Sequence, residues 1–88
     1  MGSTAGVILR VEASVYGKVT IEVSDGKRYF SDLSDLSKVY CFPKDLSEWR
    51  SVGIDSYGLS LIWASRFEAH IDQIIALAYK SEEVQKSA

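Results

Sequence analysis

The chain has little of what several classes of protein require. One cysteine among 88 residues cannot form an internal disulfide, which favours a reducing compartment such as the cytoplasm. No apolar run approaches the roughly 18 residues of a membrane-spanning helix, and Arg10 and Glu12 interrupt the early stretch at 7–9 that could have resembled a secretory signal. The net charge is only −2, too weak a field to indicate nucleic acid. We therefore expect a cytoplasmic protein with no membrane partner, and we do not expect this chain alone to bind nucleic acid.

Residue types that carry catalysis are also scarce. His70 is the only histidine and Cys41 the only thiol, whereas a metal site needs three or four ligands. The aromatic neighbours of Cys41 predict a buried, unreactive thiol, and His70 is expected to be a packing or half-exposed side chain. No Gly-x-Ser-x-Gly motif and no phosphate-cradling glycine loop occur. We therefore expect no catalytic residue, metal or cofactor and no enzyme activity; the alternative is a small ligand-binding domain or hydrolase built around a polar pocket.

The residues that are present predict one domain. Hydrophobic residues make up 47% of the chain and charged residues 25%, which is typical of a globular protein. The small residues at 1–6 predict a flexible N-terminus, and the polar run 81–88 predicts a C-terminal tail. Between them, residues 7–80 are expected to form a single α+β domain with a mostly antiparallel sheet of five strands.

Two alternating segments, 7–15 and 18–24, predict the first two strands. A three-residue loop at Tyr16-Gly17-Lys18 keeps their apolar residues on one face. It places Val15 opposite Val19, Ala13 opposite Ile21 and Val11 opposite Val23. The cost of this register is a like-charge pair, because Glu12 then lies opposite Glu22.

Asp25-Gly26 is a strong hairpin signal, and the next strand is expected at 27–30. A two-residue turn would place Ile21 opposite Phe30. A three-residue loop with Gly26 in the left-handed conformation would place Glu22 opposite Arg28. Both registers remain open. The outer face of this sheet is expected to carry Lys18, Thr20, Glu22 and Tyr29.

The middle of the chain predicts short elements. Helical turns are expected near 32–38, where Ser31 or Asp32 can cap, and near 44–49, starting at Pro43. A second hairpin is expected from strands 51–55 and 59–63, with Ile54 opposite Leu59 and Val52 opposite Leu61.

The end of the chain predicts a helix at 66–80 packed on one face of the sheet. Ser65 and Glu68 have the spacing of a capping box. An apolar stripe at helical spacing follows, formed by Phe67, Ile71, Ile74 and Ala78.

Several of these segments occur in an order known from a protein family. They are Val19-Thr-Ile-Glu-Val, Asp25-Gly26-Lys27, Phe30-Ser-Asp32-Leu33, Lys44-Asp45-Leu46 and Gly58-…-Leu61-Ile62-Trp63. Over roughly residues 7–79 the chain resembles the small bacterial proteins catalogued as domain of unknown function 2442. Ala64 replaces the usual proline after the tryptophan, and residues 65–68 replace an acidic loop. The resemblance implies an α+β domain without established activity or functional residues. It also implies a regulatory role, such as one half of a toxin–antitoxin-like pair.

Aromatic residues are numerous for so short a chain. They could all serve the core, since aromatic side chains bury much area in a small domain. Alternatively some of them form a contact surface for a partner protein. The candidate partner contacts are Trp49, Tyr57, Tyr40 and Arg50. A homodimer is a further alternative, formed through the edge strand at 7–13 or through the terminal helix. The predicted function is therefore a small regulatory or protein-binding module.

Overall fold

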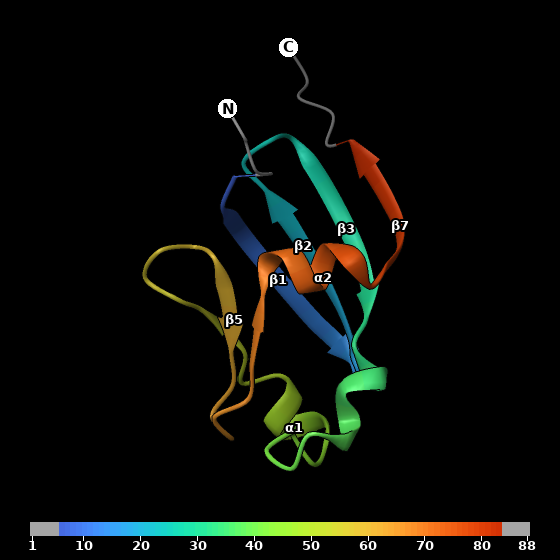
Figure 1. The fold of residues 1–88 in the computed structure, drawn as a ribbon, viewed down its shortest axis with the longest axis vertical. Coiled ribbons are helices and arrows are strands. Elements are labelled where there is room, and N and C mark those ends of the chain that lie inside the picture. Colours follow the sequence, from blue (N-terminus) through green and yellow to red (C-terminus); the bar gives the residue numbers. More distant parts are fainter. Residues whose placement is uncertain (1–5, 84–88) are drawn as a thin grey trace.

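The computed structural model describes residues 6–83, which form two antiparallel sheets and three short helices (Figure 1). Residues 1–5 of the flexible segment expected at 1–6 and residues 84–88 of the tail expected at 81–88 lie outside the described residues. The first sheet has the strand order β1-β2-β3-β7 and the second has the order β4-β5-β6. The strands are β1 (Ile8–Val15), β2 (Lys18–Val23), β3 (Lys27–Asp32), β4 (Gly53–Ile54), β5 (Ser60–Ile62), β6 (Glu68–His70) and β7 (Ala78–Glu83). The helices are the 3-10 helix η1 (Ser34–Lys38), α1 (Leu46–Trp49) and α2 (Ile71–Ala76).

The α+β class is thus confirmed, but the single five-stranded sheet is not. Strands occur at each of the five expected places, and β1 lies at an edge of its sheet as expected. The second hairpin, however, pairs with β6 in a separate sheet instead of joining the first. The fourth strand of the first sheet is β7, which comes from the end of the chain.

The predicted register between β1 and β2 is wrong. Val11 lies opposite Ile21 and Val15 opposite Lys18, so the turn has two residues. Irregularities between Glu12 and Val15, and again near the start of β1, shift the pairing. Such bulges reverse the alternation of side chains. They allow both Ile8 and Ala13, which differ in parity, to be buried.

The register between β2 and β3, which the sequence leaves open, is the one with a three-residue loop. Gly26 has a φ of +90°, the left-handed conformation that glycine adopts without steric cost. Glu22 lies opposite Arg28 and Thr20 opposite Phe30. The same register places Ile21 opposite Tyr29, so Tyr29 packs against the core and Phe30 takes the expected place of Tyr29 on the outer face.

The helix expected at 66–80 is wrong in most of its length. Glu68–His70 pairs with β5, and Ala78–Glu83 pairs with β3, which leaves only Ile71–Ala76 as helix. The cap is His70, whose Nδ1 accepts a hydrogen bond from the Asp72 amide at 3.1 Å, rather than Ser65. β7 also extends to residue 83, so the start of the expected tail belongs to the sheet.

The second hairpin has an even-length loop, as expected, but a different register. Ile54 lies opposite Leu61, because the loop comprises residues 56–59. The carboxylate of Asp55 closes this loop by accepting from the amides of Leu59 and Ser60 at 2.9 and 3.3 Å.

The two short helices of the middle segment fall where helical turns are expected. Helix α1 begins at Leu46, after Pro43, because Asp45 is its N-cap and accepts from the Glu48 amide at 2.9 Å. The Glu48 carboxylate in turn accepts from the Lys44 amide at 2.7 Å. This reciprocal pair stabilises a helix of only four residues.

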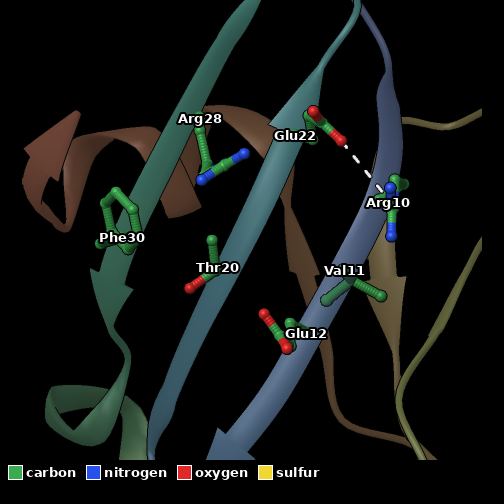
Figure 2. A pocket seen from close by; sticks show the side chains of 7 residues that line it. All are labelled: Arg10, Val11, Glu12, Thr20, Glu22, Arg28 and Phe30. Carbon is green, nitrogen blue, oxygen red and sulfur yellow. Dashed lines mark ion pairs between the residues drawn. The ribbon is translucent and has the colours of Figure 1, made fainter. Parts of the chain in front are cut away.

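The core lies on one side of the four-stranded sheet. Figure 1 shows α2 crossing that face, with α1 and η1 gathered at one end. The hydroxyl of Ser31, buried in β3, donates to the carbonyl of Ile74 in α2 at 2.7 Å and ties the helix to the sheet. Figure 1 shows no helix or strand of residues 6–83 on the opposite face, where Arg10, Glu12 and Lys80 are exposed, and Figure 2 views the sheet from that side.

Candidate protein-binding surface

Trp49, a predicted partner contact, is buried and cannot contact a partner in the folded protein. Its exposed fraction is 0%, and its indole Nε1 donates to the carbonyl of Lys18 at 2.9 Å. The ring stacks on Trp63 with centroids 4.8 Å apart. The indole of Trp63 donates in turn to the carbonyl of Trp49 at 2.8 Å. The prediction of Trp49 as a contact residue is therefore corrected. A short helix can place a large aromatic ring in the core, and here the ring of Trp49 is buried and its indole N–H has a hydrogen-bond acceptor.

Trp49 belongs to a packed group of rings at the α1 end of the molecule, which we call the aromatic base. Its members are Tyr16, Phe42, Trp49, Trp63 and Phe67. Neighbouring ring centroids lie 4.8 to 6.0 Å apart, in tilted, edge-on or stacked arrangements. These distances and angles are those that favour aromatic packing. Phe42, Trp49, Trp63 and Phe67 are buried and serve the core, whereas Tyr16 is 44% exposed and packs at its edge.

The other three predicted contact residues lie at the surface, but the fold does not gather them into one patch. Tyr40 is 96% exposed and Tyr57 is 76% exposed, and Arg50 is also exposed. Tyr40 follows η1 and Arg50 follows α1, whereas Tyr57 lies in the loop between β4 and β5. In Figure 1 that loop, drawn in yellow, is well separated from the α1 end. Tyr40 and Tyr57 therefore present two separate contact points.

A larger candidate surface is the uncovered face of the four-stranded sheet. We call it the open face, formed by Arg10, Glu12, Thr20, Glu22, Arg28 and Phe30 (Figure 2). With Val11, these side chains enclose a shallow hollow of about 360 Å³. They come from three adjacent strands, and the register brings them together.

The strand register arranges the open face in two rows. Across the strands from β1 to β3, row one reads Arg10, Glu22, Arg28, and row two reads Glu12, Thr20, Phe30. Row one therefore alternates in charge, and Arg10 Nε lies 3.8 Å from the Glu22 carboxylate. The side chain of Arg10 is 81% exposed and that of Glu22 is 22% exposed. This pair is worth little by itself, because one partner is almost fully in water.

Two cations lie over aromatic rings beside the open face. The Lys80 ammonium lies 5.5 Å from the centroid of Phe30, and the Lys18 ammonium lies 5.6 Å from that of Tyr79. Both distances fall within the range of cation–π attraction. The 60% exposed ring of Tyr79 extends the polar and aromatic character of this side of the sheet as far as β7.

A second hollow, of about 430 Å³, adjoins Tyr40, and we call it the Tyr40 pocket. Besides Tyr40, its lining is Cys41, Phe42, Lys44, Glu48, Ser65 and Arg66. Cys41 is half-buried rather than buried as expected, and its thiol lies 3.8 Å from the carbonyl of Arg66. Arg66 has a φ of +75°, a left-handed conformation that carries a steric cost in any residue with a Cβ.

The groups that could perform catalysis are not brought together. His70 caps α2, and its Nδ1 lies 3.7 Å from the Asp72 carboxylate, but the two side chains are 52% and 75% exposed and neither lines a described hollow. No group of three or more His, Cys, Asp or Glu side chains within residues 6–83 is placed to hold a metal ion. In the same range, no helix is long and apolar enough to span a bilayer.

One carboxyl has a perturbed acidity. Asp32 ends β3, and its Oδ1 accepts from the hydroxyl of Ser34 at 2.7 Å and from the amide of Ser34 at 3.0 Å. These hydrogen bonds, the hydroxyl first, hold the pKa of Asp32 below its usual range, because both favour the carboxylate. These bonds close the turn that leads into η1, but the N-cap position is Leu33 and has no side-chain cap, so the cap expected from Ser31 or Asp32 is not formed.

Comparison with known proteins adds no identity. No family model, no curated protein and no solved structure matches the chain. The resemblance described above therefore rests on the order of the sequence segments alone.

Proposed function

We propose that the protein is a small, non-enzymatic protein-binding module that uses the open face as its contact surface. The observation that carries this proposal is the ordered set of side chains on the face of the four-stranded sheet away from α2, where Arg10 and Glu12 are exposed. An antiparallel sheet can simply expose one face to water. The open face differs from a merely solvated one because Phe30 and Thr20, both half-buried, lie among charges of both signs.

The charges of the open face favour a protein over a nucleic acid as its partner. A nucleic-acid surface concentrates positive charge against phosphates. Here Glu12 and Glu22 stand between Arg10 and Arg28. Such a mixture suits a partner that itself presents both signs of charge, which adds specificity and fixes register.

The resemblance to domain of unknown function 2442 supports a regulatory version of this role. A cytoplasmic module that binds one partner, as in a toxin–antitoxin-like pair, agrees with the weak net charge and the single thiol. Tyr40, Tyr57 and Arg50 are secondary contact candidates, because they are exposed at separate points of the surface.

The experiment is a comparison of retained partners. Tagged protein is exposed to an extract of cells that express the untagged chain, and retained proteins, including untagged copies, are identified. Thr20→Arg fills the hollow of the open face without altering a core residue. Gln73→Arg adds the same charge at an exposed position of α2, on the opposite side of the sheet. Retention by the wild type and by Gln73→Arg, with loss in Thr20→Arg, is the expected result.

Two results would contradict the proposal. One is that the wild type retains no protein. The other is that Thr20→Arg retains the same proteins as the wild type, which would place the contact elsewhere. In that second case Tyr40→Ser and Tyr57→Ser decide whether either exposed tyrosine is that contact.

A small-ligand site is the second candidate, favoured by the Tyr40 pocket. Its volume lies within the roughly 300–1,000 Å³ typical of ligand pockets. Its cations, Lys44 and Arg66, favour an anionic ligand. Chemical-shift changes confined to residues 40–48 and 65–66 on titration with small carboxylates or phosphates would support it, and their absence would exclude these two ligand classes.

A further inference from the structure

The Tyr40 pocket lies between two segments whose conformations are fixed by the rest of the fold. Segment 40–44 is anchored by the ring of Phe42, which belongs to the aromatic base. Segment 65–66 belongs to a tight turn, in which the Arg66 amide donates to the carbonyl of Trp63 at 2.9 Å. The pocket is therefore formed in the free protein, and a ligand does not have to order its walls.

Arg66 occupies a backbone position that favours glycine. Its φ of +75° carries a steric cost that a residue without a Cβ avoids. Residues with such strain are common at binding sites, where the side chain is needed in spite of its cost. Arg66 lines the pocket, and a guanidinium presents its N–H donors in a planar fork that matches a carboxylate. The strain thus indicates the guanidinium as a binding group.

The charges around the pocket match a ligand with one negative charge. Two cations, Lys44 and Arg66, line it together with one carboxylate, Glu48, so its net charge is +1. One oxygen of that carboxylate already accepts from the Lys44 amide at 2.7 Å. Within residues 6–83, neither the Lys44 ammonium nor the Arg66 guanidinium forms an ion pair. A single carboxylate satisfies both cations, whereas a phosphate monoester, with about 1.5 to 2 negative charges, would bring its second charge close to Glu48.

A hydroxyl in the pocket lining lacks a hydrogen-bond partner. The Oγ of Ser65 is shielded from water, and nothing within residues 6–83 donates to it or accepts from it. Unsatisfied buried polar groups are uncommon in native proteins, and each calls for an explanation such as a bound group. Rotation about the one side-chain bond that positions this hydroxyl would let it donate to a carboxylate oxygen beside Arg66, the next residue.

The remainder of the lining is apolar and favours a ligand with an apolar body. Tyr40, Cys41 and Phe42 form this part, and Tyr40 is 96% exposed. A ring so exposed has no role in the core and can stack on a flat ligand. The hollow of about 430 Å³ also exceeds what a carboxylate alone would fill, since a water molecule takes about 30 Å³.

We propose that the Tyr40 pocket binds a small monocarboxylate with a flat apolar body. The carboxylate lies against the Arg66 guanidinium and the Lys44 ammonium, and the body lies against the ring of Tyr40. The inference rests on the small-ligand site proposed above, of which it names the ligand class, and it does not depend on the open face.

The test is an NMR titration of the full chain with benzoate and three matched probes. Acetate lacks the body, benzyl alcohol lacks the charge, and phenyl phosphate carries a second charge. Benzoate at about millimolar concentration should shift the amide signals of 40–44 and 65–66. Each of the other three probes should bind about tenfold more weakly, because each departs from the pocket in one feature.

Variants separate binding from folding. Arg66→Gly should raise the dissociation constant for benzoate about tenfold or more, because a charge-assisted hydrogen bond is lost, although the same change relieves the strain. A variant that is at least as stable as the wild type but binds less cannot be explained by a structural role. Arg50→Gly, the same substitution at an exposed arginine outside the pocket with a φ of −76°, should bind as the wild type. Tyr40→Ser should weaken benzoate and leave acetate unchanged.

Three results would overturn the inference. If acetate or phenyl phosphate binds as tightly as benzoate, the ligand class is wrong but a small-ligand site remains. If Arg66→Gly binds benzoate as the wild type does, the anion lies elsewhere. If all four probes leave the signals of 40–44 and 65–66 unshifted, the small-ligand site itself is rejected. None of these outcomes bears on the open face, which Thr20→Arg tests separately.

Discussion

The aromatic base and the open face are built from different parts of the chain. The base residues lie in turns, loops and α1, whereas the open-face residues lie on β1, β2 and β3. In the base, five rings pack at 4.8 to 6.0 Å, and both indole N–H groups donate to backbone carbonyls. On the open face, charges of both signs surround a shallow hollow and Phe30. The packing of the base indicates that it contributes much of the stability, and the open face is the surface for which we propose recognition. Substitutions in the two regions should therefore change different measurements.

The largest effect should come from Trp49→Ala. It removes the stacking on Trp63 and the bond to the Lys18 carbonyl, and it opens a cavity, so the free energy of unfolding should fall by about 3–5 kcal/mol. Urea unfolding measures the change. Tyr57→Ala, at a residue 76% exposed, is the control and should change stability by less than about 0.5 kcal/mol. Equal losses in the two variants would contradict the assignment of stability to the base.

A smaller loss is expected where the helix is tied to the sheet. Ser31→Ala removes the hydroxyl that donates to Ile74, and the free energy of unfolding should fall by about 1 kcal/mol. Ser81→Ala, at an exposed serine of β7, serves as the matched control in the same unfolding assay. A Ser31→Ala variant as stable as the wild type would show that this bond does not hold α2 in place.

Arg66→Gly should raise stability. The φ of +75° costs an arginine energy that glycine does not incur, and the expected gain is about 0.5–1 kcal/mol. Arg66→Ala retains a Cβ and should show no such gain, which separates the backbone effect from loss of the side chain. If both variants are equally stable, backbone conformation is not the cause.

The smallest effect concerns pH. Because the folded pKa of Asp32 is depressed, its ionised form contributes stability above the unfolded pKa of about 3.9, and this contribution is lost as the pH falls through the folded pKa. Ser34→Ala removes the stronger of the two donors, so the pKa should rise toward its usual value. Carboxyl NMR titration detects the shift, and Ser37→Ala in the same helix is the control. An unchanged titration in Ser34→Ala would contradict the role of the hydroxyl.

The positions of the hairpin strands could be predicted from the sequence, but the registers between them could not. Alternation located β1 and β2, and the Asp25-Gly26 turn located β3 after them. The first register failed because bulges let residues of different parity share a face, and no local signal in β1 marks a bulge. The register between β2 and β3 depends on whether the loop at Gly26 has two or three residues. The sequence of the loop alone does not fix this length, because the pairing of both strands contributes to it.

The prediction of a helix at 66–80 is wrong in most of its length because buried residues follow two different spacings in this segment. Phe67, Ala69 and Ile71 are buried at a spacing of two, whereas Ile71 and Ile74 are buried at a spacing of three. The alternation through 67–71 could have indicated a strand. The pairing of 78–83 with β3 has no local signature, because an edge strand of polar residues resembles a frayed helix end.

Only some residues of the candidate surface could be predicted from the sequence. Tyr40 and Tyr57 are exposed, as turn-rich surroundings suggest, whereas the burial of Trp49 depends on Lys18 and Trp63, which are distant in sequence. Thr20 and Glu22 were expected on the outer face. Phe30, Arg10 and Arg28 join them only through the actual registers, so the two rows could not be seen before the fold was known.

Stability and binding, measured together in one pair of variants, test directly whether the open face binds a partner. Thr20→Arg changes the open face and Gln73→Arg changes the exposed side of α2 by the same charge. We expect both variants to unfold within about 0.5 kcal/mol of the wild type, while only Thr20→Arg loses the bound protein. A Thr20→Arg variant that remains as stable as the wild type and still retains every partner would contradict the assignment of recognition to the open face.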